Sequence, residues 1–125
     1  MLNLARCGVR NLDRAKGFYD EVAALLGATR VFEYPNVIGY KGAEGATFLV
    51  GLPFENEATA GNGVQFSFIA PSRAAVDAIH AKALELGGKC EGPPGLRGPE
   101  ENGFYAAYFR DLDGNKLMAF RQGAA

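Results

Sequence analysis

The hydrophobic positions of the first half of the chain change from an alternating to a helical pattern and back again. Residues 2–9 alternate as in a strand, and Asn11 is a residue type that favours a helix N-cap. From Leu12 the apolar residues recur at helical spacing until Gly27, a typical C-terminal stop. Short apolar segments then predict three further strands, at 29–33, 36–41 and 46–52.

The same order of elements returns in the second half. GVQFSFIA (63–70) has the pattern of a strand, Ser72 is a second N-cap candidate, and the following helix ends at Gly87-Gly88. Strand-like segments then lie near 89–92, at 104–111 and at 116–121, with a Gly/Pro-rich loop predicted at 92–103.

This repeat predicts an α+β fold with two βαβββ modules. One module cannot cover both faces of its own sheet, so pairing two modules is the simplest way to bury a core. We expect one domain over residues 1–125, with module one at about 1–56, a polar linker at about 53–63 and module two at about 63–122. The modules should form curved mixed sheets around a cleft, with the helices outside.

Strand alternation assigns side chains to the two faces of each predicted sheet. Ala5, Cys7 and Val9 suit the helix side, which leaves Leu4 and Arg6 on the other face. A sheet face that mixes apolar area with a few polar groups is suited to a ligand pocket. The predicted ligand-binding residues are Arg6, Tyr40, Phe48, Gln65, Ser67, Arg97, Tyr105, Met118 and Phe120.

The charges and cysteines exclude several classes of function. Thirteen basic and fourteen acidic residues are mixed along the chain, with no basic stripe for nucleic acid or an anionic membrane. The N-terminus lacks the apolar run of a signal peptide, and Cys7 and Cys90 form no CxxC motif. We therefore expect a cytoplasmic protein with two free thiols, of which Cys7 is buried.

Two other candidate sites have simpler structural explanations. His80 is the single histidine, has no carboxylate at ligand spacing, and favours a structural role on its helix. The segment 111–115, Asp-Leu-Asp-Gly-Asn, lacks the spacing of a calcium loop, and its Gly and Asn suit a turn between antiparallel strands.

Three stretches in register resemble a known family. GVRNLDRAKGFYD (8–20), the second-half helix and loop at 71–97, and YAAYFRDLDGNKLMAF (105–120) are similar to the corresponding parts of glyoxalase, bleomycin-resistance and extradiol-dioxygenase proteins. This group is the vicinal oxygen chelate superfamily, and the chain most resembles its small glyoxalase-like bacterial members. The resemblance covers nearly the whole chain.

The resemblance implies where a metal would be held. Metal-dependent members use a His or Glu in the first strand and a Glu in the last strand of each module. Carried over by position, these places fall on Leu4, Gln65, Met118 and, by a loose alignment, Val50. Aliphatic, thioether and amide side chains are poor ligands for a hard divalent cation. We therefore expect no metal and no other cofactor, and no catalytic residue is identified.

Three functions stay open at this point. The first is binding of a small organic molecule without a metal, as in bleomycin-resistance relatives. The alternative is a glyoxalase-like lyase or isomerase, or a dioxygenase-related enzyme, acting on a carbonyl or glutathione-adduct substrate; the carboxylates nearest the module-one strands are Glu33, Glu44 and Glu55. The third is a structural module whose cleft is filled by its own side chains. The resemblance also implies a homodimer.

Overall fold

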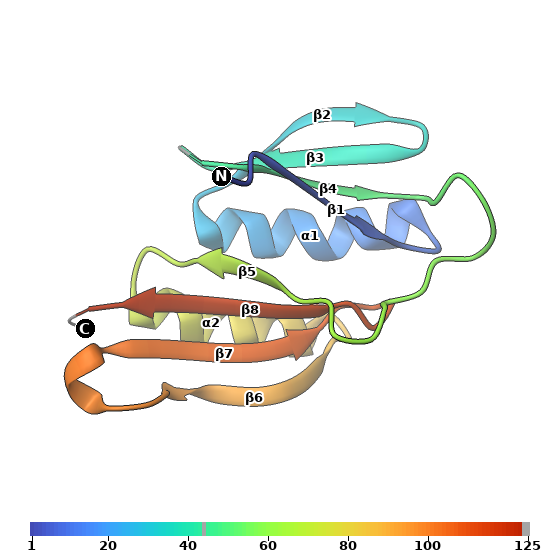
Figure 1. Cartoon of the computed structure of the whole chain (residues 1–125). Coiled ribbons are helices and arrows are strands. Elements are labelled where there is room, and N and C mark those ends of the chain that lie inside the picture. Colours follow the sequence, from blue (N-terminus) through green and yellow to red (C-terminus); the bar gives the residue numbers. More distant parts are fainter. Residues whose placement is uncertain (44, 124–125) are drawn as a thin grey trace.

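The computed structural model describes residues 1–43 and 45–123. Glu44, one of the carboxylates considered above, lies outside these residues. The α+β class with two helices and eight strands is confirmed, and the strands form two four-stranded mixed sheets. Figure 1 shows the two sheets as neighbouring layers, each accompanied by one helix.

The first sheet has the strand order β1-β4-β3-β2. β1 is parallel to β4, and the other neighbours are antiparallel. Its strands are β1 (Leu4–Gly8), β2 (Thr29–Tyr34), β3 (Val37–Lys41) and β4 (Thr47–Gly51), and the helix of this module is α1 (Leu12–Leu26).

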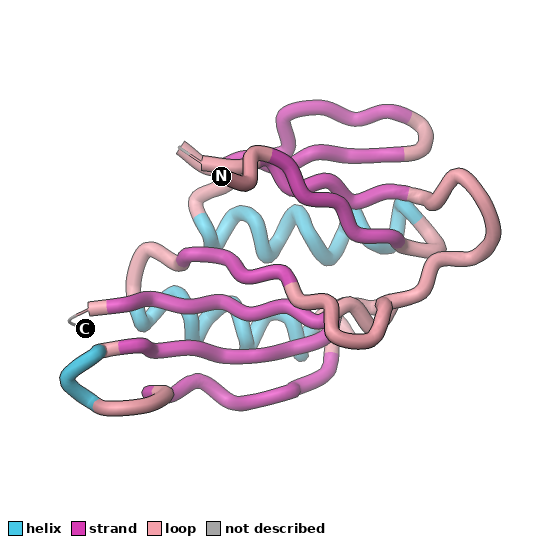
Figure 2. The backbone as a smooth tube through the Cα atoms, viewed as in Figure 1, coloured by secondary structure: helices cyan, strands magenta, loops and turns pink. Residues whose placement is uncertain are grey.

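The second sheet repeats this topology with the order β5-β8-β7-β6, and β5 is again parallel to its neighbour β8. A long loop without helix or strand joins the two sheets (Figure 2). The elements are β5 (Phe66–Ile69), α2 (Arg73–Glu85), β6 (Lys89–Leu96), a short 3₁₀ helix (Glu100–Asn102), β7 (Phe104–Arg110) and β8 (Lys116–Gln122).

Both helices begin at the predicted N-caps. The side-chain oxygen of Asn11 accepts a hydrogen bond from the backbone N–H of Arg14 at 2.9 Å. The hydroxyl of Ser72 accepts one from the N–H of Ala75 at 3.0 Å. Each cap satisfies one of the N–H groups that a first helical turn leaves without a partner.

Both helices also end in the same way. The N–H of Ala28 donates to the carbonyl of Ala23 at 2.8 Å across Gly27, whose φ of 75° is left-handed. The N–H of Gly88 donates to the carbonyl of Ala83 at 2.8 Å. These six-residue closures are Schellman motifs, for which a glycine is the favoured residue.

The predicted loop at 92–103 is partly wrong, because β6 continues to Leu96. Pro93 and Pro94 argued against a strand, but β6 lies at the edge of its sheet. A proline on an edge strand need not donate a ladder hydrogen bond, and two irregularities between Cys90 and Gly95 let the strand pass them.

The two modules share one hydrophobic core. Phe18 and Val22 of α1 belong to the same buried cluster as Ile79 of α2 and Phe109 of β7, and each is at most 1% exposed. The helices therefore pack against each other as well as against their own sheets. None of the helices within the described residues is long and apolar enough to cross a membrane.

Candidate functional site

The predicted faces of β1 and β8 agree with the structure. Cys7 and Val9 are buried, whereas Leu4 on the opposite face of β1 is 56% exposed. In β8, Leu117 and Ala119 are buried on the helix side. The alternation pattern was informative here because these strands carry different residue types on their two faces.

Three aromatic residues lie on the other face from the one expected. Tyr40 and Phe48 are paired across β3 and β4 and face α1, where the Tyr40 hydroxyl donates to Asp20 at 2.6 Å. Tyr105 faces α2, where its hydroxyl donates to Asp77 at 2.6 Å. β3, β4 and β7 carry apolar residues on both faces, so periodicity alone did not distinguish the sides.

Val50 also lies on the helix side and not in a cleft. It is fully buried and pairs with Cys7 of β1, in the opposite orientation to Leu4. On β4 the residue that shares the outward face with Arg6 is Leu49. Val50 therefore does not share a face with Leu4, and on β4 only a shift of one residue, to Leu49, places a side chain on that face.

The donor set does not fit the metal of the metal-dependent relatives. The corresponding face offers Leu4, Leu49, Gln65 and Met118, none of which is an imidazole or carboxylate. Within residues 1–43 and 45–123, no group of three or more His, Cys, Asp or Glu side chains is placed to hold a metal ion.

The structure has a cavity of about 570 Å³ between the two sheets, which we call the seam cavity. It lies between α1, the helix side of the first sheet and the strand β5. Among its lining residues are Ala5, Tyr19, Tyr40, Phe48, Gln65, Phe66, Ser67, Phe68 and Ile69. Four of these, Tyr40, Phe48, Gln65 and Ser67, were among the predicted ligand-binding residues. This volume is in the usual range for a small-molecule site.

The polar side chains of the seam cavity come from both modules: Tyr19, Tyr40, Lys41 and Thr47 from module one, and Gln65 and Ser67 from β5 and the residue before it. Five consecutive residues, 65–69, line it, and alternate side chains of a strand point in opposite directions, so the strand must present its edge. β5 pairs only with β8, which leaves the other edge without a strand partner among the described residues. The amide of Gln65 donates to the Ser67 hydroxyl at 3.2 Å beside this edge.

An aromatic cluster forms the apolar wall. The ring centroid of Phe48 lies 5.6 Å from Tyr19, 5.3 Å from Phe66 and 5.1 Å from Phe68. The first two rings belong to module one and the others to module two, so the cluster holds the two sheets together beside the cavity. Edge-to-face and tilted aromatic pairs of this kind stabilise both the core and an aromatic ligand.

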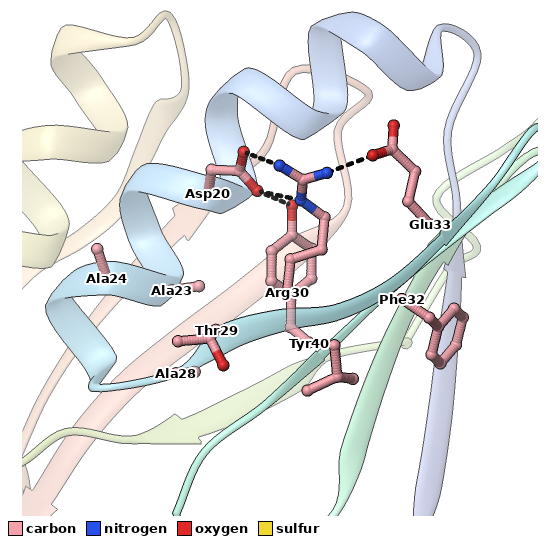
Figure 3. Close-up of a pocket in the computed structure, with 10 residues that line it drawn as sticks. Asp20, Ala23, Ala24, Ala28, Thr29, Arg30, Phe32, Glu33 and Tyr40 are labelled. Atoms are coloured by element: carbon pink, nitrogen blue, oxygen red, sulfur yellow. Dashed lines mark hydrogen bonds and ion pairs between the residues drawn. The ribbon is translucent and has the colours of Figure 1, made fainter.

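A second hollow of about 490 Å³ shares the lining residues Ala23, Ala28 and Tyr40 with the seam cavity (Figure 3). Its charged groups already pair with one another: Arg30 contacts both Asp20 and Glu33, and Asp20 also accepts from Tyr40. Burial and the hydrogen bond to Asp20 raise the pKa of Tyr40, so its hydroxyl stays protonated. The seam cavity is the better candidate, because the edge of β5 beside it has no strand partner among the described residues.

Arg6 and Arg97, the two predicted ligand cations, make contacts within the chain. Arg6 is exposed, donates to the carbonyl of Leu52 at 2.7 Å, and lies 5.5 Å over the ring of Phe54. We expected Arg6 in an enclosed cleft, but its side chain is open to solvent. Arg97 donates to the carbonyls of Pro93 and Gly95 in the preceding strand β6. Neither side chain lines the seam cavity.

The last two predicted residues lie on the face of β8 away from the helices. Met118 is 8% exposed and pairs with Ser67, while Phe120 is half-buried and stacks on Phe104 with centroids 5.3 Å apart. They share this face with Ser67 but stand outside the seam cavity. Their role in ligand binding, like that of every residue predicted above, stays a prediction.

A buried polar network connects the two modules and was not predicted. Asp111 accepts from the Tyr19 hydroxyl at 2.6 Å, from the Asn115 side chain at 2.9 Å, and from the backbone N–H groups of residues 113 and 115. Asn115 also donates to the carbonyl of Gly8 at 2.9 Å. The predicted turn is confirmed, and in addition it binds module two to α1 and β1.

Two ionisable groups beside this network are held in their neutral forms. Burial, with the nearby Cys7 and Asp111, raises the pKa of Tyr19 well above its usual value. Burial raises the pKa of the Cys7 thiol to about 12. Cys7 is therefore an apolar core residue, as its position in the strand pattern predicted.

Comparison with known proteins supports the resemblance seen in the sequence. A glyoxalase/bleomycin resistance protein from Albidiferax ferrireducens T118 is 36% identical, with a TM-score of 0.88 over 97% of this chain and 98% of that chain. A lactoylglutathione lyase from Agrobacterium tumefaciens is 24% identical, with a TM-score of 0.67 over 97% and 92%, and shows a similar fold. No curated protein matched the chain.

A family model covers almost the entire sequence. The model of the Glyoxalase/Bleomycin resistance protein/Dioxygenase superfamily matches residues 2–119, which include module one and all of module two except the end of β8. The repeated βαβββ topology, the parallel pairing of each first strand with the last strand of its module, and this match agree. The chain therefore belongs to the Glyoxalase/Bleomycin resistance protein/Dioxygenase superfamily.

Proposed function

We propose that this protein binds a small organic molecule in the seam cavity without the help of a metal. The observation that carries the proposal is the combination of an aromatic wall around Phe48 with an edge of β5 that has no strand partner among the described residues. The rings favour a flat or aromatic ligand. The edge of β5, with Gln65 and Ser67, supplies the few polar groups that orient it.

A fluorescent probe tests this proposal directly. We expect anilinonaphthalene sulfonate, a small aromatic anion that fluoresces in apolar surroundings, to bind one molecule per chain. Ser67→Phe places a ring at the cavity and should weaken this binding at least tenfold. Thr59→Phe, an exposed position in the joining loop and outside the cavity, is the matched control and should leave it unchanged.

Two results of this experiment contradict the proposal. One is the absence of saturable probe binding by the folded wild type, which supports a self-filled module instead. The other is equal loss of binding in Ser67→Phe and Thr59→Phe. Mass spectrometry of the purified protein under native conditions identifies any natural ligand that remains bound.

Metal independence is a separate part of the proposal. We expect less than one-tenth equivalent of Zn²⁺, Ni²⁺, Mn²⁺ or Fe²⁺ after purification, and probe binding unchanged by excess chelator, because the donor set lacks imidazole and carboxylate groups. A stoichiometric metal accompanied by lyase activity on a carbonyl or glutathione-adduct substrate would favour the enzymatic alternative.

We also propose that two copies associate through the faces turned away from the helices. Large apolar side chains are exposed there: Leu4 is 56% and Ile69 67% exposed. Sedimentation equilibrium at micromolar concentration should give the dimer mass for the wild type and the monomer mass for Leu4→Glu. Leu84→Glu, on α2, should stay dimeric. A wild type that sediments as a monomer contradicts this proposal but not the binding proposal.

A further inference from the structure

A cysteine and the single histidine of the chain meet at the outer edge of module two. Nε2 of His80 on α2 lies 3.3 Å from Sγ of Cys90 on β6. Cys90 pairs with the buried Phe109, so its side chain is on the α2 side of the sheet. The pair is remote from the seam cavity, and neither residue lines it.

The two partners differ in their access to solvent. His80 is only 8% exposed and packs edge-on against Phe109, with ring centroids 6.4 Å apart. Cys90 is exposed, and β6 is the edge strand of its sheet, so no further strand covers the sulfur among the described residues. The buried imidazole of His80 therefore contacts a thiol, that of Cys90, which a small molecule in solution can reach.

The surroundings keep His80 neutral at physiological pH. Burial lowers the pKa of His80, and Asp77 on the same helix opposes this only in part. From β7 it meets the uncharged Phe109, and on β6 Lys89 and Glu91 alternate to the other face, where Glu91 pairs with Arg110. A neutral imidazole at hydrogen-bond distance can accept the proton of a thiol.

We propose that Cys90 and His80 form a thiol–disulfide exchange site, at which a low-molecular-weight disulfide of the glutathione class modifies Cys90. His80 takes the proton of the Cys90 thiol, and the thiolate attacks one sulfur of the disulfide. A new S–S bond forms to Cys90, the original S–S bond breaks, and the leaving thiolate recovers the proton from His80. The products are the mixed disulfide and one free small thiol.

The chain contains an internal control for this reaction. Cys7 is 3% exposed, its pKa is raised to about 12, and its nearest polar partner is the Tyr19 hydroxyl at 3.8 Å. A buried protonated thiol does not exchange with disulfides. We therefore expect Cys90 to react alone in the folded protein, and a Cys7 adduct reports unfolding.

The test is the rate of adduct formation with oxidised glutathione, followed by intact mass spectrometry and peptide mapping from pH 6.5 to 8.5. We expect one adduct per chain, at Cys90, with a rate constant that rises far less than tenfold per pH unit, because attack assisted by the neutral imidazole of His80 does not require the thiol proton to be lost to solvent first. In His80→Asn the rate should be at least tenfold lower at pH 7. It should then rise about tenfold per pH unit below the usual thiol pKa of about 8.5.

Two outcomes overturn the proposal. One is a wild-type rate that rises tenfold per pH unit like that of an isolated thiol, and the other is an identical profile in the wild type and His80→Asn. If His80→Asn unfolds, which a Cys7 adduct would reveal, the wild-type pH profile alone decides. Cys90→Ser should abolish the adduct and leave probe binding in the seam cavity unchanged, which separates this inference from the proposed function.

Discussion

Asp111→Ala is expected to lower the free energy of unfolding by about 4 kcal/mol, as measured by urea denaturation at pH 7. The carboxylate accepts four hydrogen bonds within 2.6–2.9 Å, and Asp111 itself is 5% exposed. Alanine leaves the buried Tyr19 hydroxyl and two backbone N–H groups without partners. Each such loss costs about 1–3 kcal/mol, and partial entry of water into the gap reduces the sum.

Three further variants show whether the loss arises from the network. Tyr19→Phe removes one donor and should cost about 1.5 kcal/mol. The double variant Asp111→Ala/Tyr19→Phe should be less destabilised than the sum of the single variants, because the second change removes a group that the first left unpaired. Asp13→Ala, an exposed carboxylate in the first turn of α1, is the matched control and should change stability by less than about 1 kcal/mol. Equal effects of Asp111→Ala and Asp13→Ala contradict this account.

The sequence predicted the elements well wherever a local signal determined them. Asn11 and Ser72 satisfy the first turns of their helices, and Gly27 closes the first helix, because capping depends on residues three or four positions apart. The same local signals recur in the second half of the chain, and this repeat predicted two modules with the same order of elements. The strand predicted near 89–92 was too short, because its prolines suggested a loop. Prolines are tolerated at a sheet edge, and whether a strand lies at an edge depends on the whole sheet.

The candidate site was predicted only in part, because it depends on contacts between distant segments. Gln65 and Ser67 line the seam cavity just before β5 and within it, but the cavity itself arises where β5 approaches α1 and the first sheet. The hydrogen bond from Tyr19 to Asp111 joins positions 92 residues apart, and no local pattern indicates it. The pairing of His80 with Cys90 likewise depends on how α2 lies across β6.

Val50→Glu is expected to destabilise the protein by about 5 kcal/mol at pH 7, whereas Leu49→Glu should cost less than about 2 kcal/mol. Val50 is 0% exposed and lies within the shared core. Leu49 is half-buried and lies on the outward face with Arg6. A carboxyl group at Val50 has no partner and stays protonated in the folded state. Overpacking adds about 1–3 kcal/mol.

The pH dependence of Val50→Glu distinguishes burial of the carboxyl group from simple loss of packing. The folded-state pKa is raised above the unfolded value of about 4.3, so the unfolded state releases a proton that the folded state keeps. Stability is therefore lost as the pH rises, by about 1.36 kcal/mol per unit, and the variant should be about 2.5 kcal/mol more stable at pH 5 than at pH 7, relative to wild type. Leu49→Glu, which remains ionised beside solvent and near Arg6, should show little of this slope. If Val50→Glu were as stable as Leu49→Glu at both pH values, Val50 could not lie in the core. Leu49 could then no longer be preferred to Val50 as the β4 residue that shares a face with Leu4.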